Sequence, residues 1–422
     1  MKKKEIFKWI KDQRKKHHLT VKQMDLSKLE KWIFNKKEIC HESKKFFKIV
    51  GIRIQSNFYK QKRWDQPIIF QNEIGILGII KNIKTNKYLL QAKAEPGNIN
   101  KIQISPTVQA TKSNYSRVHG GKKIPYLKYF KKKNKHFSLQ TEQAFRYFNK
   151  KNSNIISFVS KRIELDEKFR WFSKKEILEL LKEKNLINMD TLSVFSSFIK
   201  KNRTDTPLNN EKSITEWKKS LNKKYFLKNN LIDLDILNNW NLNKKKIYHQ
   251  KNKYFSVIGI KVNTNKREIS YWDQPIIKGS KMAFAGYLIK KFKNTNHYLC
   301  RYILKPGSKV STFTCSVNTS KFFGYQRSED LTNFQKKLIS KYFINSNRTE
   351  LLYDNILSDE GGRFYHSQIK YMACKLDKSQ EINLPESYIW LSQNQVIDLI
   401  KKQKIDIEAR LLFGIINFKE IT

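Results

Sequence analysis

The most constraining feature of this 422-residue chain is an internal repeat. The segment RWDQPII at 63–69 returns as YWDQPII at 271–277, and Trp32, His41 and Phe47 each have an identical residue 208 positions later. A period near 210 residues is far longer than the repeat unit of a solenoid. We therefore expect two homologous domains, 1–207 and 208–422, joined at the Asn- and Lys-rich stretch around Pro207. They are called the first half and the second half below.

Both halves carry the same local folding signals. Ser173 with Glu176, and Ser392 with Gln395, have the spacing of capping boxes that open apolar-periodic helices. Strand-like apolar stretches precede the first of these helices at 46–54, 75–83, 87–95 and 100–105. Strands and helices in turn, twice over, predict an α+β fold with a mixed sheet in each half.

The formal charge of +48 makes nucleic acid a candidate partner. However, the lysines are spread along the whole chain, and Asn, Ile, Phe and Tyr are in excess as well, which is the pattern left by AT-rich coding. We therefore favour compositional drift over nucleic-acid binding. The charge would still help to attract an anionic, phosphorylated substrate.

The sequence also indicates where the protein works. Its four cysteines, Cys40, Cys300, Cys315 and Cys374, form no CxxC pair, which argues against a structural zinc site and suits a reducing cytosol. No apolar run approaches the roughly 18 residues of a membrane-spanning helix, and the charged N-terminus lacks the apolar core of a signal peptide. We expect a cytoplasmic protein with no membrane segment.

The stretch 91–121 differs from the rest of the chain because small polar residues replace Lys and Phe. Alternation places Gln91, Lys93 and Glu95 on one face of a strand, and Pro96-Gly97 suits a type II turn into a second strand. An ordinary surface hairpin would show the same alternation. A functional site is favoured by the hydrogen-bond donors and acceptors that follow this hairpin closely, namely Thr107, Gln109, Thr111, Asn114, Tyr115, Arg117 and His119.

These segments carry a family resemblance. WDQPII, GILGII, QAKAEPGN, QISPTVQATKSNYSRVHGG, TEQAFRYF, INMDTLSV and, in the second half, DEGGRFYHSQIKYM occur in this order along nearly the full chain. Together they resemble the NDP-hexose 2,3-dehydratase family, and the long central motif is the specific one.

The resemblance implies a fold and an activity. The fold would be two Nudix-hydrolase-like mixed-sheet modules produced by duplication, and neither half contains the Nudix metal box. The activity would be that of a hydro-lyase in deoxysugar biosynthesis, which converts dTDP-4-dehydro-6-deoxy-glucose to a 3,4-didehydro-2,6-dideoxy sugar. The resemblance also implies a homodimer without a metal or redox cofactor.

That elimination needs a base for the C3 proton, donors for the enolate oxygen and an acid for the C2 hydroxyl. His119 and Glu95 are the candidate bases. His119 could instead cap the turn at Gly120-Gly121, and Glu95 could instead form a surface pair with Lys93. Both alternatives remain open. Tyr115 is the candidate donor to the oxyanion or the leaving oxygen, with simple packing as its alternative.

The nucleotide needs cations or backbone donors for its diphosphate and an aromatic face for its base. Gly361-Gly362-Arg363 is similar to a backbone nest followed by a cation, although a simple turn has the same composition. Arg117 and Arg146 could equally form surface ion pairs. Trp64 and Trp272 could equally pack in the core. The predicted substrate-binding residues are Trp64, Arg117, Glu142, Gln143, Ala144, Arg146, Trp272, Gly361, Gly362, Arg363 and Tyr371.

Two departures from the family pattern leave a second hypothesis open. Ala144 stands where a glycine is expected and Leu192 where an arginine is expected, so the chain could be a non-catalytic relic that binds dTDP-sugars. A pseudo-dimeric nucleic-acid-binding protein or nuclease is a distant third hypothesis. It would require repeated acidic residues, for which Asp65 and Asp273 are a matching pair.

Overall fold

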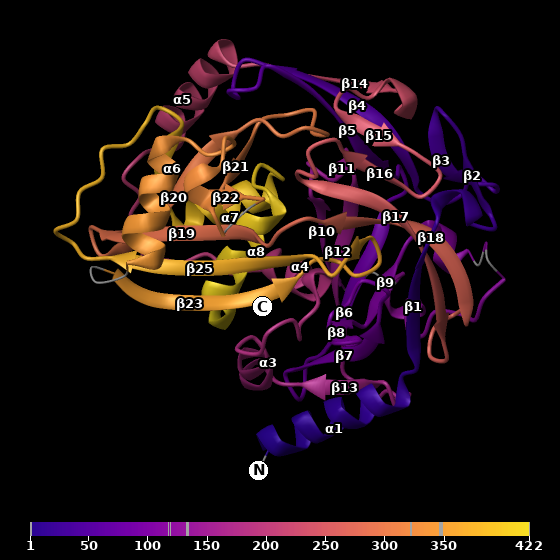
Figure 1. The fold of residues 1–422 in the computed structure, drawn as a ribbon. Helices are drawn as coiled ribbons and strands as arrows, with labels where there is room; N and C mark the ends of the chain where they lie inside the picture. The colour runs from indigo at the N-terminus through magenta and orange to yellow at the C-terminus, as the bar shows by residue number, and fades with distance from the viewer. Residues whose placement is uncertain are drawn as a thin grey trace.

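The computed structural model describes residues 2–116, 118, 120–131, 135–320, 323–345 and 349–421 (Figure 1). The first half contains, in chain order, α1 (Lys2–Lys16), β1 (Leu19–Met24), η1 (Leu26–Lys28), β2 (Trp32–Phe34), β3 (Glu38–His41), β4 (Lys48–Ser56), β5 (Arg63–Phe70), β6 (Gly75–Asn82), β7 (Lys87–Ala94), β8 (Ile102–Pro106), β9 (Val108–Ala110), α2 (Lys112–Tyr115), η2 (Leu127–Phe130), β10 (Lys135–Thr141), β11 (Tyr147–Phe148), β12 (Lys151–Val159), β13 (Phe169–Phe172), α3 (Lys174–Leu180) and α4 (Met189–Ser196).

The second half repeats this order with few changes. It contains α5 (Glu211–Lys224), β14 (Leu227–Ile232), η3 (Leu234–Ile236), β15 (Trp240–Leu242), β16 (Lys246–His249), β17 (Phe255–Thr264), β18 (Tyr271–Gly279), β19 (Ala283–Phe292), β20 (Thr295–Ile303), β21 (Thr312–Thr314), β22 (Val317–Thr319), η4 (Tyr325–Arg327), α6 (Asn333–Leu338), η5 (Ile339–Ile344), β23 (Thr349–Ser358), β24 (Phe364–Tyr365), β25 (Gln368–Leu376), β26 (Tyr388–Ser392), α7 (Gln393–Lys401), α8 (Ile407–Ile416) and η6 (Phe418–Glu420).

Each half is built around one seven-stranded and one six-stranded sheet. The seven-stranded sheets follow the orders β10-β12-β6-β7-β13 and β23-β25-β19-β20-β21, with β8 and β9 added to the first and β22 and β26 to the second. Both are mixed, because β12 runs parallel to β6 and β25 runs parallel to β19. The predicted α+β class and the internal duplication are confirmed.

The six-stranded sheets join the two halves by exchanging a strand. Strand β1 of the first half pairs antiparallel with β17, and β14 of the second half pairs antiparallel with β4 (Figure 1). The registers are equivalent, since Leu19 lies opposite Thr264 and Leu227 lies opposite Ser56. Each half therefore completes a sheet of the other.

The repeated WDQP segments strengthen this connection. The Trp32 indole donates to the Asp273 carbonyl at 3.0 Å, and the Trp240 indole donates to the Asp65 carbonyl at 2.7 Å. The Asp273 carboxylate accepts the backbone N–H of Glu30 at 2.9 Å, and the Asp65 carboxylate accepts that of Asn238 at the same distance. The repeated aspartates thus hold backbone of the opposite half, so they do not support the nuclease hypothesis.

The predicted helix starts are confirmed, since both Ser173–Glu176 and Ser392–Gln395 form reciprocal capping boxes. Helices α4 and α8 pack on each other and each lies against the seven-stranded sheet of its own half. The largest buried apolar cluster spans both halves around this helix pair. No described helix is long and apolar enough to cross a membrane.

The predicted hairpin is confirmed by the pairing of β7 with β8, but its turn is not type II. The Asn98 N–H bonds to the Glu95 carbonyl at 3.0 Å, yet Gly97 lacks the positive φ that a type II turn needs. Glycine is required here for another reason. A Cβ on Gly97 would collide with the carbonyl oxygen of Phe364, because the second half packs directly on this turn.

Candidate functional site

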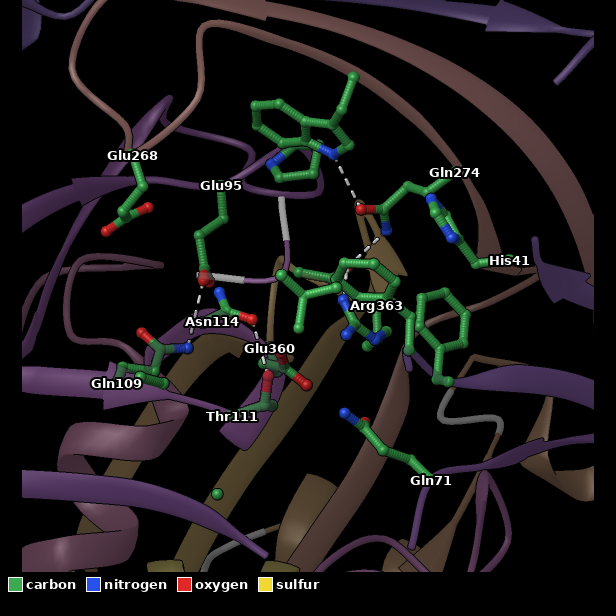
Figure 2. A pocket seen from close by; sticks show the side chains of 18 of the residues that line it. His41, Gln71, Glu95, Gln109, Thr111, Asn114, Glu268, Gln274, Glu360 and Arg363 are labelled. Atoms are coloured by element: carbon green, nitrogen blue, oxygen red, sulfur yellow. Dashed lines mark hydrogen bonds between the residues drawn. The ribbon is translucent and has the colours of Figure 1, made fainter. Parts of the chain in front are cut away.

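A pocket of about 460 Å³ lies between the two halves, within the size range of small-molecule sites. The first half lines it with the β2–β3 hairpin, with β7 and β9, and with the segment around 142–152. The second half lines it with the loop before β18 and with the segment 360–363. Figure 2 shows Glu95, Gln109 and Glu360 on one side of Arg363, with His41 and Gln71 on the other. Neither half forms this pocket alone.

Glu95 is held on the polar face of the hairpin. Its Oε1 accepts from the Gln109 amide at 3.1 Å and lies 3.1 Å from the Lys93 ammonium, which also donates to Gln109 at 2.8 Å. The Asn188 amide lies 3.4 Å from the other carboxylate oxygen. Glu95 is only 2% exposed, so these contacts fix its carboxylate at the pocket wall.

The second half reaches this carboxylate through Arg267. Its guanidinium donates to the Ala94 carbonyl at 3.0 Å and lies 3.8 Å from Glu95. Burial alone would raise the pKa of Glu95, but Lys93 and Arg267 outweigh it and lower that pKa. Glu95 is therefore ionised at neutral pH and can accept a proton.

Three of the other acids that line the pocket have a raised pKa instead. Burial and the neighbouring Glu360 carboxylate raise the pKa of Glu142 to about 6. Burial and the same carboxylate raise the pKa of Asp190 well above its usual range. Burial also raises the pKa of Glu360, against the attraction of Arg363. An ionised carboxylate and carboxyls with a raised pKa thus share a single pocket, which is the arrangement that separates a base from an acid.

Arg363 brings an incompletely satisfied cation to the pocket. Its guanidinium stacks 4.0 Å above the Phe47 ring of the first half and donates to the Gly362 carbonyl at 3.0 Å. Its Nε is buried without a hydrogen-bond partner among the described residues. A buried donor without a partner is costly, so an anionic ligand group would complete it.

An aromatic group lies beside this cation. Trp272 donates through its indole N–H to Gln274 at 2.9 Å, and Gln274 donates to the Gly362 carbonyl at 2.8 Å (Figure 2). Trp32, His41, Phe46, Phe47 and Tyr271 line the same pocket. The pocket therefore joins flat apolar faces to a cation and a group of carboxyls.

A family model described as NDP-hexose 2,3-dehydratase matches residues 3–198 and again 211–416. The chain belongs to the NDP-hexose 2,3-dehydratase family. The double match in this 2,3-dehydratase family member follows the repeat and covers most of both halves.

Three curated relatives carry one name, dTDP-4-dehydro-6-deoxy-alpha-D-glucopyranose 2,3-dehydratase. The protein from Saccharopolyspora spinosa is 29% identical over 96% of this chain and 89% of its own length. Those from Streptomyces violaceoruber and Amycolatopsis orientalis are 28% and 29% identical over 97% of this chain, and over 96% and 89% of their own lengths.

Among solved structures, the crystal structure of an ADP compounds hydrolase is similar to part of the chain. It is 14% identical and covers 39% of this chain and 85% of its own, with a TM-score of 0.24. A likeness at that level supports no conclusion about the fold of this 2,3-dehydratase family member.

The predicted site residues fall into three groups. Glu95, Glu142, Trp272, Gly362 and Arg363 line the pocket. Arg117 and His119 lie outside the described residues. The third group does not line the pocket and comprises Trp64, Tyr115, Gln143, Ala144, Arg146, Gly361 and Tyr371.

Most of the third group has a clear structural surrounding. Tyr115 packs against the apolar cluster around Phe130. Arg146 stacks 4.4 Å above the Phe255 ring, as Arg363 does above the corresponding Phe47. Gln143 donates to Asp359 of the second half at 2.8 Å. Among the family departures, Leu192 is a buried core residue of α4 and does not line the pocket.

Sequence reasoning missed much of the pocket of this dehydratase-family chain. Asp190, Arg267 and Glu360 were not predicted, although Asp190 lies within the quoted INMDTLSV motif and Glu360 within DEGGR. Arg267 and Glu268 precede the repeated WDQP segment, where the two halves differ in sequence and offer no signal. Lys93 was recognised only as a neighbour of Glu95.

The lining also bears on metal binding. Among the described residues, no group of three or more His, Cys, Asp or Glu side chains is placed to hold a metal ion. The carboxyls of Glu95, Glu142, Asp190 and Glu360 share the pocket with the cations Lys93, Lys150, Arg267 and Arg363.

Proposed function

We propose that this protein is a hydro-lyase of deoxysugar biosynthesis that removes water across C2 and C3 of dTDP-4-dehydro-6-deoxy-glucose. The observation that carries the proposal is the pairing, in one pocket, of an ionised Glu95 with carboxyls whose pKa is raised. Membership of the 2,3-dehydratase family and the shared name of three near full-length relatives support the substrate.

The chemistry follows from the ketone at C4, which acidifies the proton on C3. Glu95 takes that proton, and the resulting enolate places negative charge on O4. Lys93 and Arg267 lie beside Glu95 and stabilise negative charge in this part of the pocket. His119 remains the second candidate base predicted from the sequence.

The nucleotide is held by the other part of the pocket. Arg363 binds the diphosphate, because its buried Nε lacks a protein partner and its guanidinium is already oriented by Phe47. Thymine stacks on the aromatic residues around Trp272 and Trp32. The sugar then extends toward Glu95 and Glu142.

The proposal extends to the architecture and setting that the family resemblance implies. Residues 1–207 and 208–422 are Nudix-hydrolase-like modules without the Nudix metal box, and the second carries a decayed or accessory site. The chain forms a homodimer and works in the cytoplasm, where its four free cysteines stay reduced. Because loss of water involves no net oxidation or reduction, the reaction requires no redox cofactor.

Incubation with dTDP-4-dehydro-6-deoxy-glucose in D2O tests the function directly. Mass spectrometry should show loss of water, release of dTDP and deuterium entering at C3 of recovered substrate. The matched control is dTDP-glucose, which lacks the C4 ketone and should remain unchanged. If the protein binds dTDP but neither exchanges C3 nor loses water, it is the sugar-binding relic and not the enzyme.

A further inference from the structure

Two of the pocket carboxyls come from corresponding loops of the two halves and have no role in the proton abstraction. Glu142 follows β10 in the first half, and Glu360 follows β23 in the second. Both line the pocket that contains Glu95. An elimination needs an acid as well as a base, so Glu142 and Glu360 are the candidates for the acid.

Glu142 is oriented through one oxygen only. The Asn152 amide N–H donates to Glu142 Oε1 at 2.6 Å. The direction of that amide is fixed at its other end, because Asn152 Oδ1 accepts the backbone N–H of Gly75 at 3.1 Å. Oε2 of Glu142 has no protein hydrogen bond among the described residues and is free to carry a proton.

Glu360 approaches from the second half. Its Oε2 accepts from the Tyr147 hydroxyl at 2.8 Å. Its Oε1 and Oε1 of Glu95 lie 2.7 and 3.7 Å from the position that a Cβ on Gly362 would take. Any side chain at 362 would therefore fill the space between the two carboxyls, and glycine keeps it open.

The charges around Glu142 favour its protonated form. Glu360 and Asp190 are the acids that face it, and Arg410 and Lys150 are the cations, with Lys150 also donating to the Glu73 carbonyl. Burial and Glu360 prevail over both cations and raise the pKa of Glu142 to about 6. An acid with a pKa near neutrality can give up a proton and regain it.

We propose that Glu142 is the acid that protonates the departing C2 hydroxyl, and that Glu360 is the positioning residue that keeps Glu142 protonated. The inference rests on the proposed function. The C3–H bond breaks, its proton passes to Glu95, and its electron pair forms the enolate. The C4 ketone then re-forms, C2=C3 forms, and the C2–O bond breaks as Glu142 gives its proton to the oxygen, which leaves as water.

Glu142→Gln separates the two proton transfers. Elimination should fall by about 10²–10⁴-fold, while C3 deuterium exchange in D2O continues, because Glu95 is untouched. Glu142→Asp should recover part of the elimination and shows that the site tolerates the change. The matched control is Asp359→Asn in the corresponding loop, which should keep both activities, since Asp359 does not line the pocket.

Two outcomes overturn the acid role of Glu142. Wild-type elimination in Glu142→Gln shows that another group protonates the leaving oxygen. Loss of exchange together with elimination shows that Glu142 is the base. Failure of the wild-type protein in both reactions would instead refute the proposed function.

Glu360→Gln tests the positioning role. Elimination requires protonated Glu142, so its rate falls as pH rises through about 6. Removing the Glu360 charge lowers the pKa of Glu142, so the fall should move to lower pH while the low-pH plateau is kept. Glu360→Asp should restore the profile. A reduced plateau with an unmoved midpoint would mean that Glu360 is merely structural.

Discussion

The pocket around Glu95 and the equivalent place around Lys305 are built on matching strands, but the residue at the matching position is an acid in the first half and a lysine in the second. Both residues follow an inner strand of a seven-stranded sheet, β7 or β20, and precede a Pro-Gly turn. Glu95 faces a pocket between the halves, whereas Lys305 lies 2.6 Å from Asp406 and 3.1 Å from Glu408. The ionic groups around Glu95 line a pocket, whereas Lys305 is 2% exposed and is enclosed by its two acidic partners.

Two aromatic residues complete this difference. Arg267 donates to the Ala94 carbonyl, and at the corresponding position Tyr59 donates its hydroxyl to the Leu304 carbonyl. Phe145 takes the place that Gly362 has in the pocket, and the Lys305 ammonium lies 5.5 Å from its ring centroid. The two halves therefore share strand order at this place and differ in the side chains that occupy it.

Replacing Glu95 by Gln should have the largest effect of any change that breaks this contrast. Both C3 exchange and turnover should fall by about 10²–10⁴-fold, because the amide cannot accept the proton. Its carbonyl oxygen can still accept from Lys93, so the fold should be retained. The control is Glu350→Gln at an exposed position of β23, which should leave the rates unchanged. Exchange at the wild-type rate in Glu95→Gln would assign the base to another group, with His119 next to be tested.

This contrast also shows how far the sequence predicts the site. The repeat, the capping boxes and the β7–β8 hairpin depend on local spacing, so they were predictable. The pocket between the halves depends on Arg267 and Glu360, which lie 172 and 265 residues after Glu95 in the chain. Periodicity in the sequence does not predict contacts between residues so far apart. For the same reason the exchange of β1 and β14 between the halves was not foreseen.

Lys305→Met should give the next largest effect, on stability rather than catalysis. The Lys305 side chain is 2% exposed, and its loss would leave Asp406 and Glu408 as unpaired charges. Removing one partner of a buried ion pair typically costs about 3–5 kcal/mol in the free energy of unfolding. Urea unfolding measures this loss, and the exposed Lys309→Met is the control. If dTDP affinity falls instead and stability is kept, the place around Lys305 binds ligand.

The two equivalent tryptophans should differ by a smaller amount. Trp272 lines the pocket and Trp64 does not, although both donate their indole N–H to the glutamine two residues later. Trp272→Ala should weaken dTDP binding by about 1–3 kcal/mol through lost stacking. Trp64→Ala should leave affinity unchanged and lower only stability, since Trp64 packs against Tyr59. Calorimetric titration of both variants decides the matter, and equal losses of affinity would show two working sites.

The smallest effect should come from Asp359, the counterpart of Glu142 outside the pocket. Burial raises the pKa of Asp359 from its ordinary value near 3.8 to about 6, against the favourable contact with Gln143. A group whose folded pKa is raised contributes stability below its unfolded pKa, and this stability is lost as pH rises through about 6.

Replacing Asp359 by Asn removes this loss of stability at high pH. Each pKa unit corresponds to about 1.4 kcal/mol, but Asp359 is partly exposed and its substitution disturbs the bond from Gln143. The net gain should therefore be about 1 kcal/mol at pH 8 and near zero at pH 4, as measured by urea unfolding at both values. The opposite result, a loss of stability at pH 8, would mean that Asp359 is ionised in the folded protein and stabilised by the charge of Arg146.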